Sequence, residues 1–118
     1  MTTVLIVDDH PPFRLQARAL LEADGFVVVG EADDGASGLE AARSLEPDVL
    51  LLDIGLPDID GFEVARRLAQ DERRTSVVLT SSREAGAYGP RLSRAPALGF
   101  IPKDELSGPA IRALLDPR

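Results

Sequence analysis

The sequence predicts one doubly wound α/β domain, in which helices cover both faces of a five-stranded parallel sheet. Short apolar runs rich in β-branched residues recur along the chain, and each is followed by a polar or glycine-containing break. Several runs are apolar on both faces, as strands between two helical layers are. The runs that predict strands are Val4–Val7, Phe26–Val29, Val49–Leu52, Val77–Leu79 and Phe100–Ile101.

The stretches between these runs have helical spacing, so we expect a repeated βα pattern over residues 1–118. The last helix should begin at Ser107, which can cap it, and turn Ile111, Leu114 and Leu115 toward the sheet. The apolar positions that give the first three stretches their helical spacing are Phe13, Leu20, Leu21, Leu39, Ala42, Leu45, Phe62, Ala65 and Leu68.

The fourth helical stretch differs from the others. Gly86, Gly89, Pro90 and Pro96 interrupt the residues between the fourth and fifth strands. Glycine lowers helix stability, and proline removes a backbone donor inside a helix. We therefore expect about five flanking helices, the fourth of them short or irregular.

Composition limits the classes of function. The chain has 118 residues, 44% of them hydrophobic and 28% charged, which suits one compact domain. It has no cysteine, which excludes disulfides, thiolate metal sites and a cysteine nucleophile. The first apolar run is too short for a signal peptide or membrane span, so we expect a cytoplasmic protein without membrane contact. The net charge of −7 argues against direct binding to nucleic acid.

Chemically suggestive residues follow four of the five predicted strands. Ligand-binding loops of an open parallel sheet lie past the carboxyl ends of its strands. With the strand order 2-1-3-4-5, the first and third strands are neighbours, so Asp8, Asp9 and Asp53 share one crevice. Charges that close together would force one carboxyl to hold a proton unless a cation neutralised them, and oxygen-only ligands suit Mg²⁺ best.

Asp53 lies at the centre of this predicted cluster, where a carboxylate can attack a phosphoryl donor. Lys103 and the Ser81 hydroxyl can contact the phosphoryl oxygens from neighbouring strands. Taken singly, each residue has a simpler explanation as a turn, a helix cap or a surface side chain. Their shared placement at one sheet edge favours a common site for phosphoryl chemistry over four independent structural roles. The only histidine, His10, is interpreted as a loop or cap residue without a catalytic role.

Five motifs resemble the receiver domains of two-component response regulators, in order and over essentially the whole chain. The similarity is greatest to nitrate-regulator-type receivers, which precede a helix-turn-helix output domain, although no such domain occurs within these residues. A flavodoxin-like fold is implied. The motifs are Val-Asp-Asp-His-Pro at 7–11, Asp-Gly at 34–35, Pro-Asp-Val-Leu-Leu-Leu-Asp at 47–53, Leu-Pro-Asp-Ile-Asp-Gly at 56–61 and Gly-Phe-Ile-Pro-Lys-Asp at 99–104.

The resemblance implies a set of roles. Asp53 would be phosphorylated, Lys103 would pair with the phosphoryl group, and Phe100 would be the rotating aromatic residue of the switch. The switch hydroxyl would be Ser81 or Thr80, and the spacing from Asp53 and Lys103 favours Ser81. The expected protein ligands of Mg²⁺ are Asp8, Asp9, Asp53 and the backbone carbonyl of Gly55.

By this resemblance the protein is a phospho-acceptor in signal transduction, and it catalyses only its own phosphoryl transfer and dephosphorylation. Its phosphoryl donor would be a histidine kinase or a phosphotransfer protein, and a phosphorylation-dependent dimer is compatible with it. Two alternatives are a phosphorylation-independent adaptor and a Mg²⁺-dependent phosphohydrolase. The starting methionine and the end after the last helix weakly favour a stand-alone receiver.

Overall fold

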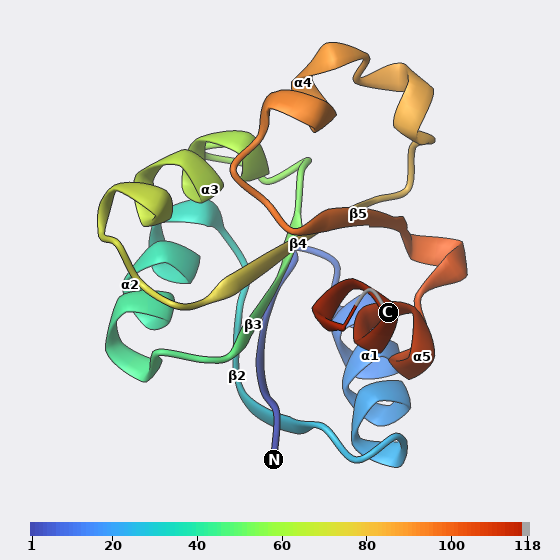
Figure 1. The fold of residues 1–118 in the computed structure, drawn as a ribbon. Coiled ribbons are helices and arrows are strands. Elements are labelled where there is room, and N and C mark those ends of the chain that lie inside the picture. Colours follow the sequence, from blue (N-terminus) through green and yellow to red (C-terminus); the bar gives the residue numbers. More distant parts are fainter. Residues whose placement is uncertain (117–118) are drawn as a thin grey trace.

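Parallel strands and helices alternate along the chain, as the apolar runs predict (Figure 1). The computed structural model describes residues 1–116. The strands are β1 (Thr3–Val7), β2 (Val27–Ala32), β3 (Val49–Asp53), β4 (Ser76–Ser81) and β5 (Gly99–Pro102). The α-helices are α1 (Pro11–Ala23), α2 (Gly35–Leu45), α3 (Gly61–Gln70), α4 (Pro90–Arg94) and α5 (Gly108–Leu115). Two short 3₁₀ helices are η1 (Ala85–Ala87) and η2 (Lys103–Glu105).

The five strands form one parallel sheet in the order β2-β1-β3-β4-β5, which confirms the predicted topology. β1 and β3 are neighbours, with Val7 opposite Leu52. β3 pairs with β4 so that Asp53 lies opposite Thr80. The carboxyl ends of β1, β3 and β4 therefore meet at one edge of the sheet, where the order of connections reverses.

Alternate residues of the central strand supply two separate hydrophobic cores. Leu50 and Leu52 pack with α2 and α3, whereas Val49 and Leu51 pack with α1 and α5. Figure 1 shows these two pairs of helices on opposite sides of the sheet. All five residues of β3 are buried. Burial on both faces explains why this strand is a continuous apolar run.

Most of the apolar positions that give the helices their spacing lie in or against the core, whereas Leu45 is exposed. It is the last residue of α2, and its side chain is 46% exposed. Glu46 then adopts a left-handed conformation with a φ of 47° and ends the helix. The side chain of Leu45 reaches Gly30 of β2, which is an edge strand with no further strand beyond it to cover Leu45.

Side-chain caps define where three helices begin. The Ser107 hydroxyl accepts a hydrogen bond from the Ala110 N–H at 3.0 Å, as predicted. Asp34 caps α2 and Asp60 caps α3 in the same way. Such caps satisfy backbone donors that have no partner within the helix. In the part of the chain that the structure describes, no helix has the length and apolar character needed to cross a bilayer.

The segment between β4 and β5 is irregular, in agreement with its glycine and proline content. It contains only η1 and the five-residue α4, and neither has a buried residue. Gly89 has a φ of 56° and a ψ of −137°, a conformation that glycine adopts without a Cβ clash. Figure 1 shows this segment standing away from the sheet, beyond β5.

Gly61 lets α3 begin directly against the end of β3. Its N–H donates to the carbonyl of Ile54 at 2.9 Å. A Cβ at this position would lie 2.6 Å from the carbonyl oxygen of Asp53 and 2.8 Å from Ile54 Cα. These are backbone atoms that cannot rotate away. Because Gly61 has no side chain, the start of α3 can pack directly against the loop after Asp53.

We expect Gly61→Ala to lower the free energy of unfolding by about 1–3 kcal/mol, the usual cost of overpacking. Urea denaturation followed by circular dichroism measures this change. Gly86→Ala is the matched control, because a Cβ at Gly86 meets no heavy atom within 4 Å. The control should stay within about 0.5 kcal/mol of the wild type. Equal stability of the two variants would contradict the close packing at Gly61.

Candidate functional site

Three carboxylates meet where β1 and β3 end. Asp8 and Asp9 follow β1 directly, and Asp53 is the last residue of β3. Ligand atoms of these three residues and of His10 all lie within 4.8 Å of one another. The adjacency of β1 and β3 produces this acidic cluster, as the sequence predicted.

Lys103 reaches the acidic cluster from the end of β5. Its Nζ lies 2.7 Å from Asp8 Oδ2 and 3.6 Å from Asp53 Oδ2. The ammonium also lies 4.6 Å from the centre of the Phe13 ring, within the range of a cation–π contact. Its side chain is 14% exposed. Lys103 thus supplies the positive charge nearest to Asp53, and Phe13 of α1 helps to position it.

The acidic cluster is buried, which changes the protonation of Asp53. Asp8 is 0% exposed and Asp53 is 4% exposed. Burial raises the pKa of the Asp53 carboxyl above its usual range, and the charge of Asp8 raises it further. Lys103 and the hydrogen bond from the Gly55 N–H act in the opposite direction. The ionised carboxylates therefore carry more negative charge than their protein surroundings neutralise.

Two oxygens of the cluster have no aligned hydrogen-bond partner in residues 1–116. They are Asp8 Oδ2, whose contact with Lys103 is an ion pair only, and Asp9 Oδ1. Buried carboxylate oxygens without hydrogen bonds are costly unless a cation contacts them. These oxygens can serve as ligands of a divalent metal ion.

His10 belongs to the cluster, although its sequence context indicated only a loop or cap residue. It does occupy the cap position of α1, without a side-chain cap hydrogen bond. Its Nδ1 also lies 3.1 Å from Asp8 Oδ1 and 3.0 Å from Asp9 Oδ1. Its direct succession to the two aspartates was the only sequence signal for this position.

The two candidate hydroxyls on β4 differ in their surroundings. Thr80 lies opposite Asp53, and its Oγ1 is buried without a hydrogen-bond partner among the described residues. Ser81 is 4% exposed, and its Oγ accepts a hydrogen bond from the Arg83 N–H at 3.0 Å. Ser81 Oγ also lies 2.5 Å from the hydroxyl of Tyr88.

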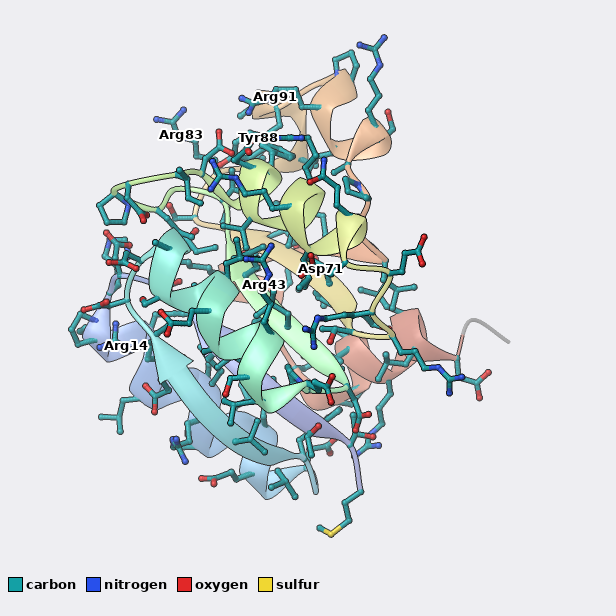
Figure 2. All side chains as sticks on the ribbon, turned by 90° about the vertical axis from the view of Figure 1, so that its left-hand side faces the viewer. Arg14, Arg43, Asp71, Arg83, Tyr88 and Arg91 are labelled. Carbon is teal, nitrogen blue, oxygen red and sulfur yellow. The ribbon has the colours of Figure 1, made fainter. Side chains whose placement is uncertain are left out.

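Tyr88 is a candidate functional residue that the sequence did not single out. Its ring makes edge contacts with Phe62 and Phe100, at centroid distances of 5.7 and 6.3 Å. Figure 2 shows Tyr88 with Arg91 above α3. Tyr88 is the only tyrosine of the chain and lies within its most irregular segment. Those two features were the only signals in the sequence that could have indicated a role for Tyr88.

Gly55 is exposed and lies in the loop that follows Asp53. Its N–H donates to Asp53 Oδ1 at 3.3 Å. A Cβ built on Gly55 would meet no heavy atom within 4 Å. This side of Asp53 is therefore not covered by a side chain at position 55.

Comparison with curated proteins identifies similar regulators. The profile of the response regulator receiver domain matches residues 4–115. A Pseudomonas aeruginosa protein named as a transcriptional regulator is 49% identical over 105 residues, which cover 89% of this chain and 51% of that protein. Response regulator GacA of Pseudomonas viridiflava is 40% identical over 104 residues, or 87% of this chain and 49% of GacA. The chain spans about half the length of these relatives.

Solved structures give the same result. The signal receiver domain of the response regulator NarL from Mycobacterium tuberculosis superposes with a TM-score of 0.88 at 38% identity, covering 98% of this chain and 94% of that chain. A LuxR-family two-component response regulator from Aurantimonas also gives 0.88, at 30% identity over 100% of this chain and 88% of that chain. Because the matched profile spans nearly all described residues, we conclude that the chain belongs to the response regulator receiver domains, the signalling domains of two-component systems.

Proposed function

We propose that this receiver domain accepts a phosphoryl group on Asp53. One observation carries the proposal: Asp53 is buried at the end of a central strand, beside the carboxylate of Asp8 and with the Lys103 ammonium 3.6 Å from its Oδ2. A carboxylate oxygen of Asp53 attacks the phosphorus of a phosphohistidine, and the phosphorus–nitrogen bond breaks. The electron pair stays on the histidine nitrogen, which takes a proton from water.

The residues of the cluster suit Mg²⁺, the cofactor that receiver domains generally use. Asp8, Asp9, Asp53 and the backbone carbonyl of Gly55 would hold it, and two carboxylate oxygens without hydrogen bonds favour a bound cation. When bound, the ion neutralises charge on the phosphoryl oxygens. Hydrolysis by water would break the phosphorus–oxygen bond, release inorganic phosphate and restore Asp53.

Lys103 and Ser81 have complementary roles in this proposal. The Lys103 ammonium pairs with a phosphoryl oxygen, because it already contacts Asp8 and lies close to Asp53. The Ser81 hydroxyl donates to another phosphoryl oxygen after Asp53 is modified, and Phe100 fills the space that it leaves. Thr80 is the alternative donor. The surface of α4, β5 and α5 would then change for a partner.

The two alternative functions receive no support from the comparisons. A phosphohydrolase that forms an aspartyl phosphate carries its nucleophile on the first strand, whereas Asp53 ends the third. A phosphorylation-independent adaptor does not require the complete cluster of Asp8, Asp9, Asp53 and Lys103.

The phosphoryl donor in this proposal is a histidine kinase or a phosphotransfer protein. The relatives include proteins named as transcriptional regulators, and those proteins are about twice as long as this chain. With a net charge of −7, the receiver is not itself expected to attract DNA. A cytoplasmic location and dimerisation on phosphorylation also stay predictions.

Incubation with phosphoramidate and Mg²⁺ should add one phosphoryl group to the wild type, as measured by intact mass. Asp53→Asn removes the proposed nucleophile and should show no adduct, while its side chain keeps a similar shape. Chelation of Mg²⁺ should also prevent the adduct. A folded wild type that binds Mg²⁺ but gains no mass would exclude phosphoryl acceptance.

Without divalent ions at neutral pH, Asp53→Asn should be more stable than the wild type. Because the pKa of Asp53 is raised in the folded state, its ionised form destabilises the fold at neutral pH. Stability of the wild type should therefore rise as the pH falls through that raised pKa. Saturating Mg²⁺ should stabilise the wild type by about 1–3 kcal/mol and Asp53→Asn by less. Thermal unfolding measures both effects, and equal Mg²⁺ responses would count against metal binding at Asp53.

Gly55→Asn should slow loss of the phosphoryl group several-fold. The added side chain enters open space next to Asp53 and would hinder the approach of water. The measurement is the decay of phosphorylated protein after removal of phosphoramidate, with Gly86→Ala as a control far from the cluster. Unchanged decay would show that the open side of Asp53 does not limit hydrolysis.

A further inference from the structure

The segment of residues 82–98 packs on the domain without a buried residue of its own. Leu92, Ala95 and Ala97 lie against the core on the α2 and α3 side of the sheet, each only partly buried. The guanidinium of Arg91 lies 4.3 Å from the centre of the Phe62 ring and 3.1 Å from Asp60 Oδ2. Figure 2 shows Arg91 and Tyr88 on the same side of the molecule. A segment without fully buried residues opens more easily than the sheet does.

Tyr88 connects this segment to the candidate switch residue through its side chain, and Arg83 does so through its backbone N–H. Its ring packs between Phe62 of α3 and Phe100 of β5, with interplanar angles of 69° and 62°. Its hydroxyl forms a 2.5 Å hydrogen bond with Ser81 Oγ. Ser81 therefore has two partners, the Tyr88 hydroxyl and the Arg83 N–H, and neither belongs to the acidic cluster.

We propose that Tyr88 is a positioning residue that holds the Ser81 hydroxyl away from Asp53 in the unphosphorylated protein. This inference rests on the proposed phosphorylation of Asp53. A hydroxyl has one proton and two lone pairs. The Arg83 N–H occupies one lone pair, and the Tyr88 hydroxyl takes the proton or the other lone pair. When Ser81 donates to Tyr88, its only proton is committed, and Ser81 must release Tyr88 before it can donate to a phosphoryl oxygen.

The loss of this hydrogen bond has a consequence for the segment. When Ser81 turns toward the phosphoryl group, the Tyr88 hydroxyl loses its buried partner, which lowers the stability of the packed ring. Gly89, with its φ of 56°, follows Tyr88 directly and allows the backbone to swing there. Phosphorylation therefore releases Tyr88 together with α4. By linkage, a partner that binds the released segment favours phosphorylation of Asp53.

The single tyrosine provides a direct test. The chain has one tyrosine and no tryptophan, so its tyrosine emission comes from Tyr88 alone. Quenching of this emission by acrylamide should increase when beryllofluoride, a phosphoryl analogue, binds the full chain with Mg²⁺. Fluorine NMR shows independently whether the analogue has bound. Bound analogue with unchanged quenching would overturn the role of Tyr88 alone, and no binding would overturn the proposed function as well.

The rate of phosphorylation by phosphoramidate distinguishes the effect of the Tyr88 hydroxyl on Ser81 from the packing of the Tyr88 ring. Tyr88→Phe keeps the ring and removes the hydroxyl, so phosphorylation should become about 2- to 10-fold faster, the factor expected for one net hydrogen bond. The same substitution should have no effect in a Ser81→Ala background. It should keep its full effect in a Thr80→Val background, because Thr80 Oγ1 has no partner among the described residues. Equal effects in all three backgrounds would overturn the proposal.

Discussion

The crowding of Asp8 and Asp53 beside Lys103 is the interaction on which the site depends. Two carboxylates with almost no exposure lie within one cluster, and one ammonium 2.7 Å from Asp8 offsets only part of their charge. Burial raises the pKa of Asp53, and the negative charge of Asp8 raises it further. In the proposed function, a cation bound at the cluster would offset this excess charge.

The sheet tolerates this crowding because its two hydrophobic cores fix β1 and β3 from both sides. Leu50 and Leu52 anchor β3 to α2 and α3, while Val49 and Leu51 anchor it to α1 and α5. The loop after Asp53 is held by the hydrogen bond from Gly61 to Ile54. Packed cores on both faces therefore surround the charged cluster, and in the proposed switch a change at Asp53 would be transmitted to the segment between β4 and β5, which has no buried residue.

That segment contrasts with the rest of the domain. Its helix is too short to be stable by itself, and it depends on contacts such as those of Leu92 with the core and of Arg91 with Phe62. Ser81 lies at the junction, with its backbone in the sheet and its hydroxyl bonded to Tyr88 and to the Arg83 N–H. In the proposed switch the side-chain contact with Tyr88 is the one that Ser81 exchanges, and its net stability is that of about one hydrogen bond.

The sequence by itself determined the five strands, the cap at Ser107 and the short fourth helix, which follow from local apolar patterns and from glycine and proline positions. The meeting of Asp8, Asp9 and Asp53 with Lys103 required in addition the strand order of a flavodoxin-like sheet, in which the strands end at one edge. Only the tertiary structure decided that Leu45 is exposed, that His10 joins the cluster, that Phe13 supports Lys103 and that Tyr88 contacts Ser81. Each of these depends on how a side chain packs against residues distant in sequence or on an irregular loop, and no local periodicity encodes such a contact.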